Sequence, residues 1–144
     1  MMTRMNVSEM EPKSYEILLA MEKYLATTDL SHRLRELIKI RASQINKCAY
    51  CLEMHTKDAR ENGETEQRIY ALSAWEESPL FTDAERSALH FTEQITEISK
   101  QGVTDEVYEN LKKHFTEQQI AQMIIAIGQI NFWNRIAVST RMVH

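Results

Sequence analysis

The octapeptide Cys48-Ala49-Tyr50-Cys51-Leu52-Glu53-Met54-His55 contains both cysteines of this 144-residue chain. Each residue of an α-helix advances by about 100°, so Cys48, Cys51 and His55 are expected on one face, within about 60° of one another. Cys51 and His55 are neighbours one turn apart, and an imidazole beside a thiol favours loss of the thiol proton. A second thiol one turn away can then close a disulfide. The octapeptide therefore predicts a helix that carries dithiol redox chemistry.

The same three side chains allow two other interpretations. A structural zinc ion takes four ligands, and the fourth would have to be His32, His90 or His114, none of which stands in a paired ligand motif. Alternatively, the two cysteines are buried and inert and the histidine lies on the surface. We favour the redox interpretation, because a histidine on the same face strengthens what a Cys-x-x-Cys spacing alone indicates.

The residues flanking the octapeptide predict where its helix begins and ends. Asn46 is a good helix cap, which would place Cys48 in the first turn of the helix. Unpaired backbone N–H groups and the positive end of the helix dipole would stabilise a Cys48 thiolate there. The neighbouring His55 favours Cys51 as the nucleophile instead. Gly63 is expected to end the helix, because glycine accommodates the left-handed conformation that follows a helix.

The rest of the chain shows apolar residues at helical spacing, separated by turn and capping residues. Ser31 and Thr104 are candidate caps, and capping boxes begin at Thr82 and Thr116. We expect an arm over residues 1–13 and helices over approximately 14–26, 32–44, 47–62, 66–75, 83–100, 105–111 and 117–140. The sequence thus predicts an all-α fold, a bundle of about seven helices forming a single domain over residues 1–144.

The last expected helix, residues 117–140, is apolar on nearly all sides. Such a helix is typical of the centre of a domain, and we expect it also to contribute to a subunit interface. Gly128 in its interior costs about 1 kcal/mol relative to alanine. A close helix crossing at Gly128 would compensate for that cost.

Composition narrows the class of protein. The formal net charge of −4 provides no basic field for nucleic acid. The polar N-terminus shows no secretory signal, and no apolar run reaches the ~18 residues of a membrane span. We therefore expect the reducing cytoplasm, where two close cysteines are more often catalytic or metal-binding than a permanent disulfide.

The spacing of Glu36, Cys48-x-x-Cys51 and His55 resembles the signature of the AhpD-like alkylhydroperoxidase branch of the carboxymuconolactone decarboxylase family. Two further segments are similar to ones common in that family, Arg4-Met5-Asn6 and Asn131-x-x-Asn134-Arg135. The resemblance implies an AhpD-like helical fold, a homo-oligomer (trimer or hexamer) and reduction of a small peroxide without metal, haem or flavin.

The resemblance also implies a role for each residue of the signature. Cys51 is expected to attack the peroxide and Cys48 to resolve the product, with His55 as base and Glu36 as a carboxylate of the proton relay. A dithiol donor, lipoyl- or thioredoxin-like, would then reduce the disulfide. Tyr50 stands where the well-studied hydroperoxidases have a second histidine, and tyrosine is a poor proton acceptor at neutral pH. The relay implied for this chain is therefore shorter.

Two functions outside redox chemistry stay open from the sequence. The wider family includes decarboxylase and lactonase chemistry, which needs no dithiol, and the paired cysteines argue against it. A zinc-binding interaction module is the other alternative. Our leading hypothesis is a cytoplasmic antioxidant oxidoreductase that uses a Cys-x-x-Cys disulfide cycle.

Overall fold

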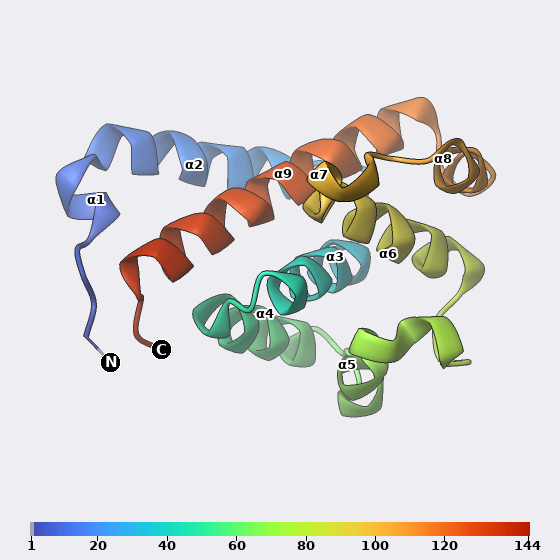
Figure 1. Cartoon of the computed structure of the whole chain (residues 1–144), viewed down its shortest axis with the longest axis horizontal. Coiled ribbons are helices and arrows are strands. Elements are labelled where there is room, and N and C mark those ends of the chain that lie inside the picture. The colour runs from blue at the N-terminus through green and yellow to red at the C-terminus, as the bar shows by residue number, and fades with distance from the viewer. Residues whose placement is uncertain (1) are drawn as a thin grey trace.

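The computed structural model describes residues 2–144, and this part of the chain is helical without any β-strand (Figure 1). This confirms the all-α prediction. The elements are α1 (Val7–Met10), α2 (Pro12–Leu25), α3 (His32–Ile45), α4 (Ala49–Glu61), α5 (Glu66–Ala71), the 3₁₀ helix η1 (Leu72–Glu77), α6 (Asp83–Thr96), α7 (Ile98–Gln101), α8 (Asp105–Lys112) and α9 (Glu117–Thr140).

Helix α3 lies at the centre of the bundle and packs against α4, α6 and α9. Its side chains enter two apolar clusters. Ile38 belongs to a cluster shared with α6, α8 and α9, whereas Leu37 and Ile40 belong to a second cluster shared with α4, η1 and α6. All three side chains are essentially inaccessible to solvent, and each such burial contributes about 1.5–3 kcal/mol. Helix α3 therefore joins the two halves of the core.

Helix α9 runs along the molecule and contacts α2, α3, α4, α6 and α8 (Figure 1). Its buried side chains include Ile120, Met123, Ile127 and Ile130. Four large apolar side chains of the same helix remain exposed in the single chain: Ile124, Ile125, Phe132 and Val138. The apolar character of this segment is thus divided between the core and an uncovered surface.

The helix starts predicted from capping residues are confirmed. The Ser31 and Thr104 side chains accept hydrogen bonds from backbone N–H groups three residues later. Both capping boxes form, Thr82 with Glu85 and Thr116 with Gln119. These signals are local, since each depends only on residues three positions apart.

Three predicted segments differ in the structure. The expected arm over residues 1–13 contains α1, and Pro12 opens α2, because proline at the first helical position lacks an N–H that would be unpaired anyway. The expected helix 66–75 divides into α5 and η1, with non-helical dihedrals at Ala74. The expected helix 83–100 divides into α6 and α7 at Glu97, whose φ and ψ are −106° and 41°. The structure therefore has more and shorter helices than the seven expected.

The close helix crossing expected at Gly128 is absent. A Cβ atom built at this position would meet no heavy atom within 4 Å. Within the single chain, no close approach therefore compensates for the glycine.

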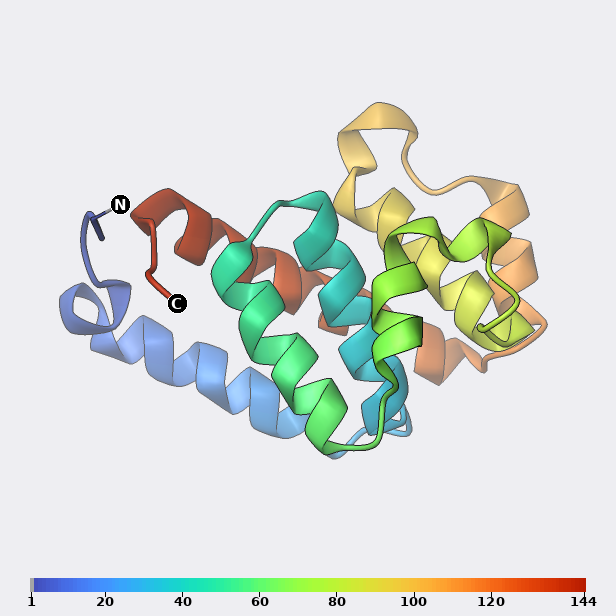
Figure 2. The same ribbon diagram turned by 90° about the horizontal axis from the view of Figure 1, so that it is seen from below.

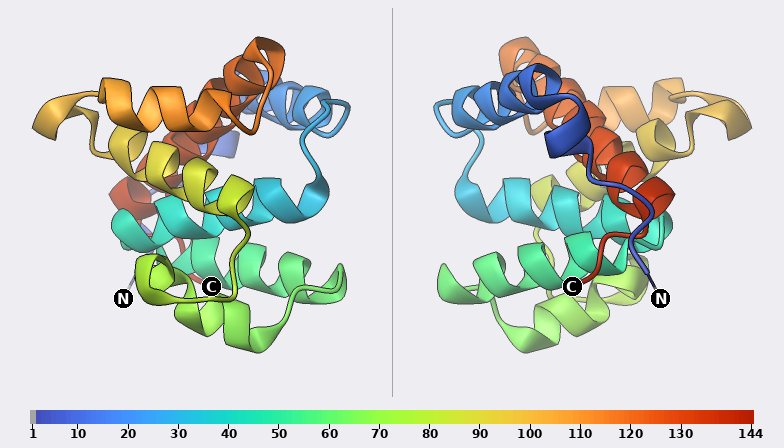
Figure 3. Two further views of the ribbon diagram at one scale, coloured as in Figure 1. Left: turned by 90° about the vertical axis from the view of Figure 1, so that its right-hand side faces the viewer. Right: turned by 90° about the vertical axis from the view of Figure 1, so that its left-hand side faces the viewer.

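The two ends of the described chain lie together (Figure 3, right). The Arg4 backbone N–H donates to the Thr140 carbonyl at 2.8 Å, and the Thr3 hydroxyl donates to the Arg141 carbonyl at 3.2 Å. The N-terminal segment is thereby held against the end of α9, close to the helix that carries the cysteines. Between residues 2 and 144, no helix combines the length and the apolarity needed to cross a membrane.

Candidate functional site

The site begins at the turn between α3 and α4. Asn46 is the C-cap of α3, and Cys48, not Asn46, is the N-cap of α4. The Cys48 sulfur accepts a hydrogen bond from the Cys51 backbone N–H at 3.3 Å. The prediction of an Asn46 cap was wrong because the Asn46 amide instead donates to Asn131 and Asn134 of α9, both at 2.9 Å. Cys48 therefore precedes the helix instead of lying inside its first turn.

Cys48 and Cys51 are joined by a disulfide, with their Cα atoms 5.3 Å apart. Both residues are buried, with 1% and 3% of their surface exposed. They form a small cluster with Ala137 of α9, and Tyr50 and Met142 pack against it. The sulfurs thus point toward each other, as the redox interpretation requires.

Glu36 and His55 face each other behind the disulfide. Glu36 lies in the second turn of α3 and its side chain is 4% exposed, while His55 lies on α4 and its side chain is 11% exposed. His55 Nδ1 is 3.3 Å from Glu36 Oε2, which is an ion-pair distance without the alignment of a good hydrogen bond. The packing of α3 against α4 therefore brings together two residues nineteen positions apart in the sequence.

Glu36 keeps its charge although it is buried. Burial alone would raise the pKa of this carboxyl, but the contact with His55 and the charges of Lys39 and His32 outweigh burial and lower the pKa below 4.5. Lys39 Nζ is 3.4 Å from Glu36 Oε1, and His32 Nε2 is 3.7 Å from the same oxygen. Glu36 is thus a carboxylate that can orient the imidazole of His55.

A cavity of about 250 Å³ opens in front of Cys51 and His55. Residues of α2, α4 and the second half of α9 supply most of its walls, and the course of these helices can be followed in Figure 2. Its lining is mainly apolar and aromatic and comprises Tyr15, Leu19, Tyr50, Met54, Trp133, Ala137 and Met142, with Glu22, Lys39 and Asp58 as further polar groups. The cavity can therefore admit a small organic molecule to the disulfide.

Trp133 belongs to this site although the sequence did not indicate it. Its indole N–H donates to Glu22 at 2.8 Å, and Glu22 also lies 3.5 Å from Lys39, which in turn contacts Glu36. A chain of contacts thus runs from the cavity wall to the buried carboxylate. Trp133 and Glu22 are 111 residues apart, so no local pattern could reveal their pairing.

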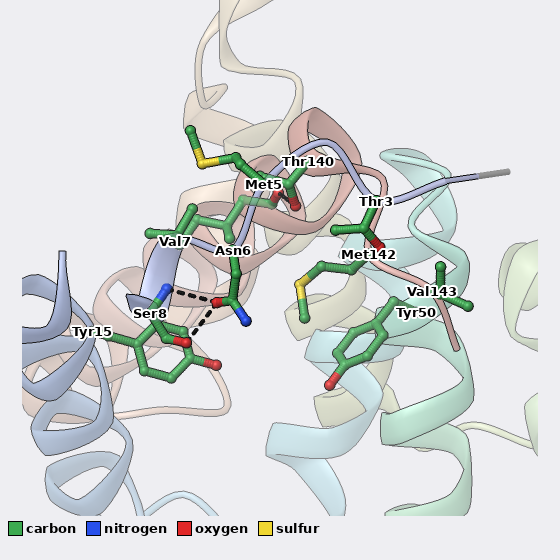
Figure 4. Close-up of a pocket in the computed structure, with 11 residues that line it drawn as sticks. Thr3, Met5, Asn6, Val7, Ser8, Tyr15, Tyr50, Thr140, Met142 and Val143 are labelled. Atoms are coloured by element: carbon green, nitrogen blue, oxygen red, sulfur yellow. Dashed lines mark hydrogen bonds between the residues drawn. The ribbon is translucent and has the colours of Figure 1, made fainter. Parts of the chain in front are cut away.

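Two further cavities adjoin the first. One, of about 290 Å³, lies between the N-terminal segment and the end of α9 (Figure 4). Figure 4 shows Asn6 and Ser8 on one side of it and Tyr50 and Met142 on the other, with the Asn6 side chain accepting hydrogen bonds from Ser8. The other, of about 300 Å³, is lined by Cys48. Tyr50 and Met142 line all three cavities and therefore separate them.

The zinc site considered from the sequence does not assemble around the sulfurs. Within residues 2–144, the side chains that cluster closely enough to hold a metal ion are Glu36, His55 and Asp58, and this group contains no cysteine. Of the histidines considered as a fourth ligand, His90 packs against the Trp75 ring and His32 contacts Glu36.

The family assignment agrees with this geometry. The sequence pattern of the carboxymuconolactone decarboxylase family matches residues 12–94, from the start of α2 to near the end of α6. The chain belongs to this family.

Two similar proteins match nearly the whole length of this chain. The uncharacterized protein YdfG of Bacillus subtilis (strain 168) is 45% identical over 139 residues, covering 96% of this chain and 95% of YdfG. A crystal structure from Agrobacterium tumefaciens, described as a putative antioxidant defence protein AhpD of unknown function, is 42% identical, with a TM-score of 0.96 and coverage of 99% and 98%. The AhpD-like fold expected from the resemblance is therefore confirmed.

More distant structures share the fold. An uncharacterized peroxidase-related protein from Silicibacter sp. TM1040 is 28% identical, with a TM-score of 0.81, and the match covers 92% of this chain and 71% of that protein. The debrominase Bmp8, solved in complex with 2,3,4-tribromopyrrole, has a TM-score of 0.83 at 18% identity over 94% of this chain and 72% of Bmp8. The fold thus occurs in proteins with different chemistry, and the site must decide the function.

Proposed function

We propose that this protein is a cytoplasmic, thiol-dependent hydroperoxide reductase that cycles between a Cys48–Cys51 dithiol and a disulfide. One observation carries the proposal: the disulfide sulfur of Cys51 and the imidazole of His55 line one cavity, and a buried carboxylate stands behind that imidazole. A nucleophile, a base and a group that orients the base are the parts that thiol chemistry needs.

The oxidising half-reaction starts from the reduced protein. His55, held by Glu36, takes the proton of the Cys51 thiol, and the thiolate attacks the peroxide. An S–O bond forms and the O–O bond breaks, while the proton on His55 passes to the departing alkoxide. The products are an alcohol and a sulfenic acid on Cys51.

Disulfide formation completes this half-reaction. The Cys48 sulfur attacks the Cys51 sulfenic acid, the S–S bond forms, and the hydroxyl leaves as water with the Cys48 proton. Two thiols and one hydroperoxide thus give one disulfide, one alcohol and one water. A dithiol donor then returns two electrons and two protons by thiol–disulfide exchange.

The cavity walls favour organic hydroperoxides over hydrogen peroxide. Tyr15, Leu19, Met54 and Trp133 surround the approach to Cys51 with apolar surface, which hydrogen peroxide cannot use for binding. We expect reduced protein to consume cumene hydroperoxide with a higher second-order rate constant than hydrogen peroxide. Equal rate constants would contradict the apolar binding role of the cavity.

A single-turnover experiment tests the proposed function. Reduced protein is mixed with cumene hydroperoxide, and intact mass and free thiols are followed in time. The expected product has lost two hydrogens and both thiols. Reduced protein that keeps both thiols while peroxide persists would overturn the proposal, and the Cys51→Ser variant supplies the background rate.

The same proposal includes a homo-oligomer, a trimer or hexamer. Exposed apolar side chains on α2 and α9 support it, among them Ile17, Tyr24, Ile124 and Phe132. Exposed apolar surface of this kind marks interaction sites. Sedimentation velocity on the wild type and on an Ile124→Glu, Phe132→Glu variant checks it, and a wild-type monomer at micromolar concentration would contradict it.

A further inference from the structure

The cavity on the Cys48 side differs in charge from the cavity on the Cys51 side. Lys47 and Arg141 line it together with Cys48, and no carboxylate does. Neither cation forms an ion pair within the part of the chain that the structure describes. Two uncompensated positive charges thus stand at the mouth of a cavity that leads to a disulfide sulfur.

The backbone at these two residues is unusual. Lys47 and Arg141 have φ values of 54° and 55°, and they are the only residues other than glycine with positive φ between positions 2 and 144. Lys47 follows the end of α3 and Arg141 is the C-cap of α9, two positions where glycine is the usual residue because it adopts this conformation without strain. The negative end of each helix dipole favours a cation at these positions, but it does not require that the two cations line one cavity with Cys48.

The burial of Cys48 limits what can reach its sulfur. The residue is 1% exposed, at the side of a cavity of about 300 Å³. A slender dithiol can enter a space of this size, which is typical of small-molecule sites. The active-site disulfide of a folded protein lies on a broad surface and would require the cavity to open.

We propose that this cavity binds a small dithiol that carries an anionic group, and that Lys47 and Arg141 hold the anion while a thiolate attacks Cys48. The inference rests on the proposed disulfide cycle and names the class of its reductant. Tyr50 and Met142 separate this cavity from the one in front of Cys51, so the reductant and the peroxide approach different sulfurs.

The thiol–disulfide exchange between the donor and the protein needs no further oxidant or reductant. The donor thiolate forms an S–S bond with Cys48, and the Cys48–Cys51 bond breaks. Cys51 leaves as a thiolate and takes up, through His55, the proton that the attacking donor thiol released to solvent. The second donor thiol then attacks the donor sulfur of the mixed disulfide, which releases Cys48 and leaves an oxidised, cyclic donor. Two electrons and two protons pass from the donor to the two cysteines.

Two reductants that differ in charge test the proposal. Dihydrolipoate carries a carboxylate, and dihydrolipoamide has the same dithiol with a neutral amide. The rate of disulfide reduction in oxidised protein is measured with each, by acid quenching and intact mass, at low ionic strength. We expect the wild type to prefer dihydrolipoate, and the preference to fall as salt is added.

The variant Lys47→Gly, Arg141→Gly removes both charges while giving each helix end its usual residue. We expect the dihydrolipoate-to-dihydrolipoamide rate ratio to fall about 10-fold, as for loss of electrostatic steering. Its melting temperature should equal or exceed that of the wild type, so misfolding cannot cause the change. The matched control, Lys23→Gln and Lys113→Gln, removes two exposed charges that line no described cavity and should keep the wild-type ratio.

Other outcomes would overturn the inference. A rate ratio unaffected by the glycine variant would show that the two cations do not select the donor. Efficient reduction by a thioredoxin-type protein together with inert small dithiols would show that the cavity opens for a protein. Failure of the proposed peroxide reductase function can be told apart from failure of this inference. The former appears in the reaction of pre-reduced protein with peroxide, and the latter in the reduction of the disulfide by the two dithiols.

Discussion

The two sulfurs of one disulfide have opposite surroundings. On the Cys51 side, mainly apolar walls surround His55, and the carboxylate of Glu36 is buried behind it. The cavity residues Glu22, Lys39 and His55 each have an ion-pair partner within 4 Å, whereas Asp58 has none in the described part of the chain. On the Cys48 side, two exposed cations without ion-pair partners border an open cavity. A mainly apolar site with a histidine and a carboxylate suits proton transfer and a small organic oxidant, whereas two cations without ion-pair partners suit capture of an anion. Under the proposed cycle, this difference between the two sides would divide the two half-reactions of the Cys48-x-x-Cys51 pair between two cavities.

The largest expected effect separates the two sulfurs. Cys51→Ser should lower peroxide consumption by at least about 10³-fold, because no thiolate remains in the cavity with His55. Cys48→Ser should consume one equivalent of peroxide and then stop, with a sulfenic acid at Cys51 that dimedone labels. Mass spectrometry of both variants checks this. If Cys51→Ser consumed peroxide at the wild-type rate and dimedone labelled its Cys48, then Cys48 and not Cys51 would be the sulfur that attacks the peroxide.

Replacement of His55 tests whether the Cys51 side supplies the proton transfer. His55→Gln should slow peroxide reduction about 100-fold at pH 7, a typical loss for a general acid–base group. Alkylation of the reduced protein by iodoacetamide, measured against pH, should show the apparent thiol pKa moving upward. An unchanged pH profile would mean that His55 does not act on the Cys51 thiol.

Replacement of Glu36 tests whether its buried carboxylate supports His55 and Lys39 on the Cys51 side. Glu36→Gln should slow peroxide reduction about 10-fold and cost about 1–3 kcal/mol of stability, because His55 and Lys39 lose a buried partner. The pKa of Glu36 is lowered in the folded state, so its stabilising contribution is present above pH 4.5 and disappears as the pH falls through the folded value.

Urea unfolding at several pH values measures this contribution. The stability difference between wild type and Glu36→Gln should shrink as the pH falls from 6 toward 3. The variant Glu16→Gln removes an exposed carboxylate that forms no ion pair and lines no cavity in the described part of the chain, and it serves as control. A difference that stays constant with pH would show that Glu36 carries no stabilising charge.

The smallest expected effect concerns the Cys48 side. Lys47→Gly should raise stability by about 1 kcal/mol, since glycine removes the cost of a left-handed residue. It should also reduce, but not eliminate, the preference for an anionic dithiol, because Arg141 remains. Thermal unfolding and the reductant rate ratio check the two parts independently.

Local patterns in the sequence predicted much of the fold. The capping boxes at Thr82 and Thr116 and the helix end at Gly63 depend on residues within one turn. They could therefore be predicted from neighbouring positions in the sequence. The Cys-x-x-Cys spacing likewise implied a disulfide, which the structure contains. The Asn46 cap and the crossing at Gly128 were wrong, because distant residues decided the first and nothing approaches the second.

The sequence by itself determined that this chain is helical, where most helices begin, and that two cysteines and a histidine stand one turn apart. Only the tertiary structure decided that Glu36 is buried against His55, that Trp133 reaches Glu22, and that Lys47 and Arg141 border one cavity. The physical reason is the separation along the sequence over which each interaction acts. Helix propensity and capping act between near neighbours, whereas burial, charge pairing and cavities arise where segments distant in the chain pack together.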